Sequence, residues 1–340
     1  FNVNVNVILP GPARTSFYDK SVGAMPEAEK DKFFASLGKK TPLQRVGTPE
    51  DLAGAIIIDP DNPSLMIAGT STGAVISRSE GKSWSVCRGV HGTGVYAHVD
   101  RTSPVNRRVL IVATTEGIWR SDDGGETWVE KTNGLPSKEI LSFAGASNAK
   151  LRTVMLYCSV RARASGREYV GGVFRSRDRG ETWESAMGKG INKDIEAADR
   201  YAMTSVAQYP AVLAADARPL TVYAMNESTG FHPPHHPTVF RSDDGGDTWK
   251  ATLFMDPRFS GRYNVAPNYV TAANGTSYQP PLHDAAICPD NPDVVMRLCG
   301  SCYLTENGGE SWYNGHTLSL IHISEPTRPL YISYAVFCLK

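Results

Sequence analysis

The sequence predicts a mainly β protein, a β-propeller built from four-stranded blades. Three observations support this: an octet ending in tryptophan recurs, strand-like runs stand at fixed places around each copy, and the copies are spaced like blades. Trp84 and Trp128, which end the first two octets, are about 44 residues apart, close to the length of one blade. The octets are "SRSEGKSW" (77–84), "SDDGGETW" (121–128), "SRDRGETW" (176–183), "SDDGGDTW" (242–249) and "TENGGESW" (305–312).

Apolar runs with strand character precede the octets. One run comes directly before, as in "TVFRSD", and a second lies further upstream, as in "RVLIVATT". Both are rich in the branched and aromatic residues that suit a pleated sheet. A third run ends in an Asp/Pro turn, as in "AIIIDPDNP" (55–63). Each unit is therefore predicted as strand, turn, strand, variable loop, strand, octet and strand, and about five such blades are present.

Each octet is expected to be a structural turn between the third and fourth strands. An aspartate can accept backbone N–H groups of its own turn, and Gly125, Gly180 and Gly246 can take the positive φ that a tight turn needs. The tryptophan can then pack between neighbouring sheets. Calcium capture by Asp122 and Asp123 is the alternative, although one octet supplies few oxygen ligands. The residues assigned this structural role are Asp123, Trp128, Asp178, Trp183, Asp244, Trp249, Asn307 and Trp312.

The octets resemble the Asp-boxes of the BNR-repeat propellers, a group that includes sialidases, sortilin-type receptors, xyloglucanase-type glycosyl hydrolases and photosystem assembly factors. The resemblance covers residues 55–316. It implies an incomplete propeller, since relatives of this kind usually close with more blades. It does not imply one function, because that group contains hydrolases, receptors and assembly factors.

Residues 1–54 differ in character and predict a small α/β fragment. The motifs "NVILPGPART" (6–15) and "PLQRVGTPEDLA" (42–53) resemble the C-terminal end of short-chain dehydrogenases/reductases. By that resemblance Pro10, Gly11 and Thr15 would lie beside a nicotinamide. The glycine-rich phosphate loop and the catalytic Ser and Tyr-x-x-x-Lys of that family are absent from this chain, so we expect no bound cofactor and no oxidoreductase activity.

The end of the chain departs from the repeat. The stretch "LSLIHISEPTRPLYISYAVFCLK" (318–340) resembles the conceptual translation of a sequencing adapter, and we expect residues 317–340 to be a non-native tail. A dehydrogenase-like fragment at one end and this tail at the other indicate a chimeric or fragmentary sequence.

The overall composition excludes some partners. The chain has 340 residues, with 35 basic and 35 acidic side chains. This balance argues against nucleic acid or an anionic membrane as the main partner, and no apolar run is long enough to span a bilayer. A monomer in an extracellular or periplasmic compartment is the expectation for the propeller, although no signal peptide is visible.

Function is expected on the face opposite the octets, where three long insertions fall: 161–171, 226–237 and 256–284. Long loops on a rigid scaffold often carry binding residues. The histidines of "HPPHHP" are separated by prolines that limit their convergence, so no metal is expected. The predicted binding residues, which suit a glycan or a peptide, are Tyr201, Arg258, Arg262, Tyr263, Tyr269, Tyr278 and His283.

Two functions remain open from the sequence. The favoured one is a non-catalytic propeller that binds a glycan or a protein segment. The alternative is an inverting glycoside hydrolase, which needs two carboxylates on opposite sides of a cleft, and Asp199 and Asp284 are the candidates. These aspartates could equally bond loop backbones. A sialidase is not expected, because the chain lacks the Arg-Ile-Pro motif of that family.

Overall fold

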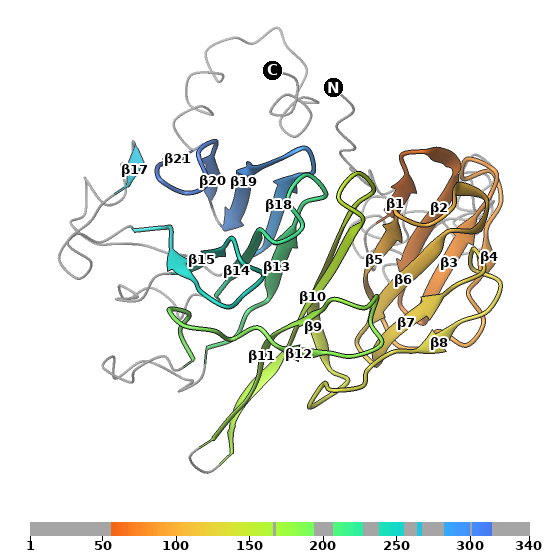
Figure 1. The fold of residues 1–340 in the computed structure, drawn as a ribbon, viewed down its shortest axis with the longest axis horizontal. Coiled ribbons are helices and arrows are strands. Elements are labelled where there is room, and N and C mark those ends of the chain that lie inside the picture. Colours follow the sequence, from red (N-terminus) through yellow and green to blue (C-terminus); the bar gives the residue numbers. More distant parts are fainter. Residues whose placement is uncertain are drawn as a thin grey trace, which may run out of the picture. The chain divides into compact units, whose positions relative to one another are not determined.

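A computed structural model of the chain describes residues 56–165, 168–193, 207–226, 238–254, 264–266, 282–299 and 301–314. These residues are nearly all β, and they build five sheets in which four consecutive strands pair antiparallel. The fold is a β-propeller of four-stranded blades, as the sequence predicts. The described residues fall into two compact units, 56–131 and 132–314 (Figure 1).

The first unit, drawn in orange and yellow in Figure 1, contains two blades. In both, strand order in the sheet follows the sequence, so each blade is a simple meander. One 3₁₀ turn, Val105–Arg107, precedes the second strand of the second blade. The strands are β1 (Ile56–Asp59), β2 (Asn62–Thr70), β3 (Gly73–Ser77), β4 (Ser85–Val86), β5 (Gly94–Asp100), β6 (Val109–Thr114), β7 (Gly117–Ser121) and β8 (Val129–Glu130).

The second unit, drawn in green and blue, contains three blades. Its last sheet has a fifth strand, β17, which pairs parallel to β21. The strands are β9 (Ile140–Asn148), β10 (Thr153–Ser165), β11 (Glu168–Ser176), β12 (Glu184–Ser185), β13 (Ala211–Ala214), β14 (Val222–Met225), β15 (Val239–Ser242), β16 (Lys250–Ala251), β17 (Val265–Ala266), β18 (Asp284–Cys288), β19 (Asn291–Cys299), β20 (Ser301–Thr305) and β21 (Trp312–Asn314).

Apolar side chains fill the space between neighbouring sheets of a unit. In the second unit one core joins the sheets of β9–β12 and β13–β16, and includes the fully buried Tyr157 and Phe240. Another joins β13–β16 to β18–β21 around Trp312. In the first unit Ile67 and Leu110 belong to the core between the two blades. Because successive side chains of a strand point to opposite faces of the sheet, a sheet that lies between two others has both of its faces buried.

All five octets lie between the third and fourth strands of a sheet, where the sequence predicts them. In the fourth copy Asp244 accepts hydrogen bonds from Ser242 Oγ at 2.7 Å, Thr248 N at 2.9 Å and Thr248 Oγ1 at 2.6 Å. Partial burial acts to raise the pKa of Asp244, but these bonds outweigh it and lower the pKa to about 2. Hydrogen bonds at the equivalent positions of the second and third octets likewise lower the pKa of Asp123 and of Asp178.

The last octet keeps this arrangement without a charge. Asn307 Oδ1 accepts from Ser311 N at 3.0 Å, and Asn307 Nδ2 donates to Ser311 Oγ at 2.8 Å. The asparagine amide thus takes the place of the carboxylate, and one hydrogen bond changes direction: Asn307 donates to the hydroxyl of Ser311, whereas Asp244 accepts from the hydroxyl of Thr248. In the first octet the hydroxyl of Ser79 accepts from Ser83 N at 2.9 Å.

The octets also connect neighbouring blades through their tryptophans, as the sequence predicts, and hydrogen bonds that were not predicted add to this contact. In the second unit Trp249 Nε1 donates to Ala186 O of the preceding blade, and Trp312 Nε1 donates to Thr252 O, both at 2.8 Å. The two acceptors occupy the same place, directly after the fourth strand. Each tryptophan therefore packs against the preceding blade and satisfies one of its carbonyls.

An arginine near the start of an octet reaches forward to the next one. Within the first unit Arg78 donates to Gly124 O at 2.8 Å, and within the second Arg175 donates to Gly245 O at 2.8 Å. Both acceptors are the fourth residue of their octet, and both have positive φ, 78° and 79°. The turn thus presents its carbonyl to the preceding blade.

One prediction about the loops is wrong. The stretch 161–171, predicted as a loop, belongs to a long β-hairpin made by β10 and β11 (Figure 1). Pairing continues to Ser165↔Glu168, past a bulge between Val160 and Arg163. The sequence hid the hairpin because the run at 161–167 consists of arginine, alanine, serine and glycine, with none of the branched and aromatic residues typical of strands. Backbone pairing joins the two strands.

Candidate functional site

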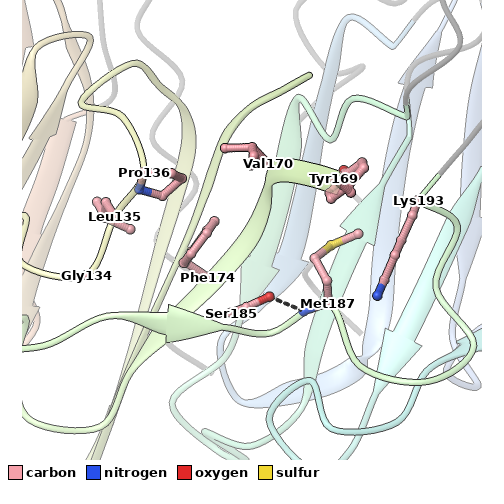
Figure 2. Close-up of a pocket in the computed structure, with 10 residues that line it drawn as sticks. Gly134, Leu135, Pro136, Tyr169, Val170, Phe174, Ser185, Met187 and Lys193 are labelled. Atoms are coloured by element: carbon pink, nitrogen blue, oxygen red, sulfur yellow. Dashed lines mark hydrogen bonds between the residues drawn. The ribbon is translucent and has the colours of Figure 1, made fainter. Parts of the chain in front are cut away.

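A pocket of about 580 Å³ lies along β11, at the point where β12 ends (Figure 2). Four segments of the second unit form it: the approach to β9, the strand β11, the end of β12 and the chain that follows β12. Its walls are mostly apolar and aromatic. The ten lining residues are Gly134, Leu135, Pro136, Tyr169, Val170, Gly171, Phe174, Ser185, Met187 and Lys193.

Two consecutive glycines give β11 its shape at the pocket. In a regular strand Tyr169 and Phe174 would project to opposite faces, yet both border this pocket. Between them, Gly171 and Gly172 have φ of 106° and 90°. A Cβ on Gly171 would lie 2.5 Å from Arg161 O, so only glycine fits opposite the bulge.

Hydrogen bonds fix the aromatic wall. Tyr169 donates its hydroxyl to Ala207 O at 3.2 Å. The neighbouring Gln208 bonds both backbone groups of the bulged Ala162, accepting from its N–H at 2.8 Å and donating to its carbonyl at 2.6 Å. The Gln208 amide therefore takes the place of a missing strand on the inner side of the hairpin. This preorganises the pocket wall.

Lys193 is the one charged residue among the ten that line the pocket. Its side chain is exposed, and Figure 2 shows it pointing toward Ser185 and Met187. Its backbone is held on both sides, because Ala207 N donates to Lys193 O at 3.1 Å and the hydroxyl of Tyr209 donates to Asn192 O. The backbone of Lys193 is thus anchored beside the pocket, and its side chain is exposed.

The strand β12 borders only part of the outer edge of β11 beside this pocket. The short strand β12 pairs only with Phe174 and Arg175, and one more bond runs from Ala186 N to Val173 O at 2.8 Å. Beyond that point, within the part of the chain that the structure describes, no strand pairs with the outer side of residues 168–172.

Two of the catalytic and binding residues predicted from the sequence lie in described segments. Asp284 is the first residue of β18, opposite Leu298, and its side chain is exposed and accepts from Ala285 N at 2.8 Å. His283 is also exposed, and its N–H donates to Leu298 O. Neither lines the pocket.

The other predicted catalytic and binding residues lie outside the described segments, as do the cofactor-linked residues and the histidine tract. They stay predictions from the sequence. They are Asp199, Tyr201, Arg258, Arg262, Tyr263, Tyr269, Tyr278, Pro10, Gly11 and Thr15.

Several ion pairs serve the scaffold instead of a site. In the first unit Arg108, 1% exposed, bonds the fully buried Asp59 at 2.7 Å and Asp61 at 2.6 Å. Burial acts to lower the pKa of Arg108, but both carboxylates outweigh it and raise that pKa. This network ties the turns of neighbouring blades together and leaves no charge free for a ligand.

Among the residues that the structure describes, no three His, Cys, Asp or Glu side chains gather as metal ligands would. In the same residues, no helix is long and apolar enough to cross a membrane.

Comparison with known proteins supports the fold. No family model and no curated protein sequence matches the chain. Among solved structures, the GH74 enzyme of Niastella koreensis matches with a TM-score of 0.53 and 18% identity, over 76% of this chain and 37% of its own. The GH74 xyloglucanase of Xanthomonas campestris matches with 0.51 and 16%, over 76% and 38%. The chain thus spans under half the length of these structures, and such low identity shows a shared fold alone.

The pocket residues escaped sequence reasoning, although one signal was available. An aromatic and a branched residue followed by two glycines, "YVGG" (169–172), indicate a strand that bends where something packs closely. The remaining walls come from Leu135 and Met187, which are distant in the sequence, and nothing local marks them.

Proposed function

We propose that this chain is a non-catalytic binding propeller, and that the pocket along β11 receives part of a glycan or polypeptide ligand. The observation that carries the proposal is the character of the pocket: aromatic and aliphatic walls and a single cation, Lys193, among the residues that line it. Binding sites commonly combine mostly apolar walls with a few placed polar groups.

The lining also favours binding over hydrolysis. None of the ten residues is an aspartate, glutamate or histidine. A glycoside hydrolase of the usual kind needs two carboxyl groups around the scissile bond. The octets do not supply them either, because the carboxylates of Asp178 and Asp244 are occupied by bonds within their own turns. We therefore propose a structural role for the octets.

Filling the pocket tests the proposal. Ser185 is exposed on β12 and lines the pocket, so Ser185→Tyr should occupy it without disturbing the core. Ser85→Tyr, on the equally short and exposed strand β4, is the matched control. Binding is measured by calorimetry against the best ligands from an oligosaccharide array and a peptide library. We expect Ser185→Tyr to weaken binding at least tenfold and Ser85→Tyr to leave it unchanged; equal effects would contradict the proposal.

A further inference from the structure

We infer that the pocket receives one large apolar side chain of a polypeptide ligand, and that an acidic residue beside this side chain contacts Lys193. This inference rests on the proposed function and names the class of ligand. Among the lining residues, the buried ones are apolar, whereas the only charge stands on an exposed residue.

The buried lining residues form an apolar floor. Phe174 and Met187 are each 7% exposed, and the half-buried Leu135, Tyr169 and Val170 stand around them. A ligand that covers this floor removes its remaining apolar surface from water, which favours an apolar group. Large side chains that fill such pockets supply much of the affinity at protein interfaces.

The polar side chains of the lining offer a sugar few partners. Apart from Lys193, only Tyr169 and Ser185 have polar side-chain atoms. Tyr169 donates its hydroxyl to Ala207 O, and Ser185 Oγ accepts from Met187 N at 3.3 Å (Figure 2). A sugar ring brings several hydroxyls, and burying a hydroxyl without a partner is unfavourable. The lining therefore favours a hydrocarbon side chain over a sugar.

The exposed lining residues form a rim on which a longer ligand can continue. In the view of Figure 2, the exposed Pro136 and Lys193 lie on opposite sides of Phe174. A polypeptide that crosses this rim can insert one side chain and keep its backbone in water. Such a ligand needs no pairing with β11, where Gly171 and Gly172 interrupt the regular strand.

Charge favours an acidic residue beside the apolar one. Lys193 is exposed at the rim, and none of the ten lining residues carries a carboxylate. Glu184, directly before Ser185, contacts Arg175 at 2.7 Å instead. A ligand carboxylate would therefore meet a cation at the rim, where hydration makes an ion pair a modest contribution to affinity.

Peptide pools with blocked ends provide the test. The full chain is titrated with acetylated and amidated octapeptides, whose two central positions are fixed as Leu and Asp, Leu and Lys, or Ser and Asp, in either order. We expect the Leu and Asp pools to bind best. Replacing Leu by Ser should weaken binding about tenfold or more, because an apolar side chain no longer fills the pocket. Replacing Asp by Lys should weaken it about fivefold.

Two variants of the protein separate the two contacts. Leu135→Asn makes a partly exposed wall polar, so it should reduce the preference for Leu over Ser and spare the preference for Asp over Lys. Lys193→Gln should do the reverse. The matched controls are Leu151→Asn and Lys189→Gln, which change exposed residues that do not line the pocket and should alter neither preference.

The same titrations can contradict the inference. Equal binding of the Ser and Leu pools, or a preference for Asp that survives Lys193→Gln, would overturn it. If oligosaccharides bind, Ser185→Tyr abolishes that binding and no peptide pool binds, the side-chain inference fails and the binding proposal stands. If neither class binds, both fail.

Discussion

The octet aspartate offers the sharpest test of a structural role, through the pair of variants Asp244→Ala and Asp244→Asn. Alanine removes the acceptor of three hydrogen bonds, from Ser242 Oγ, Thr248 N and Thr248 Oγ1. Since water can reach this partly exposed turn, we assign each bond about 1 kcal/mol, which gives a loss of about 3 kcal/mol in the free energy of unfolding.

Asparagine should be tolerated, because the chain already uses it in the last octet. Asn307 bonds the N–H and hydroxyl of Ser311 in the same places. We therefore expect Asp244→Asn to lower the free energy of unfolding by less than about 1 kcal/mol, which is the difference between one charge-assisted hydrogen bond and a neutral one.

Urea unfolding at pH 7, followed by tryptophan fluorescence, measures both variants. Trp249 ends the same octet and is buried, so its emission contributes to the unfolding signal. Equal destabilisation by alanine and asparagine would refute the reasoning, because the charge would then be essential. A gain of stability in millimolar calcium that is lost in Asp244→Asn would show a metal loop.

Three further predictions concern stability. The pKa values of Asp123, Asp178 and Asp244 lie below their ordinary value of 3.8, so the stability that they contribute is present above pH 4 and lost as the pH falls toward 2; Asp244→Asn should flatten this slope in acid titrations followed by circular dichroism. Arg108→Ala should lower the free energy of unfolding by about 3–5 kcal/mol in urea, because Asp59 would remain buried without its charged partner, whereas Arg101→Ala, which removes a partly exposed partner of Asp61, should lower it by under about 1 kcal/mol; equal losses would contradict this. Glu80 has φ of 55° at a position where three of the other four octets have glycine, so Glu80→Gly should raise the thermal midpoint, by relief of up to about 1 kcal/mol, and a lowered midpoint would count against strain there.

The fold could be predicted because its signal is local and repeated. An octet such as 242–249 contains its own acceptor, its own glycines and its own tryptophan, so eight residues determine one turn. The strand runs beside it then set the order of the sheet. Since all five octets stand at the same place relative to their strand runs, one repeated blade accounts for all of them.

The candidate site could not be predicted in the same way, because its contacts are distant in the sequence. The hairpin at 161–171 contains few of the branched and aromatic residues that mark strands, and its inner edge is completed by the side-chain amide of Gln208. The contact from Arg175 to Gly245 O likewise joins residues of different blades. Such pairings depend on how sheets stack, which no single segment specifies. The residues chosen from the sequence were the aromatic and basic ones in long polar stretches, whereas the pocket walls include plain apolar residues such as Leu135.

Amide hydrogen exchange in the presence of a bound ligand tests the central claim most directly. The full chain, saturated with the best ligand from the peptide library or the oligosaccharide array, is compared with the free chain. The account predicts slower exchange concentrated in residues 168–174 and 184–187, along β11 and the end of β12, with the octet turns unchanged. Protection that spares β11 and appears at the octets would contradict it.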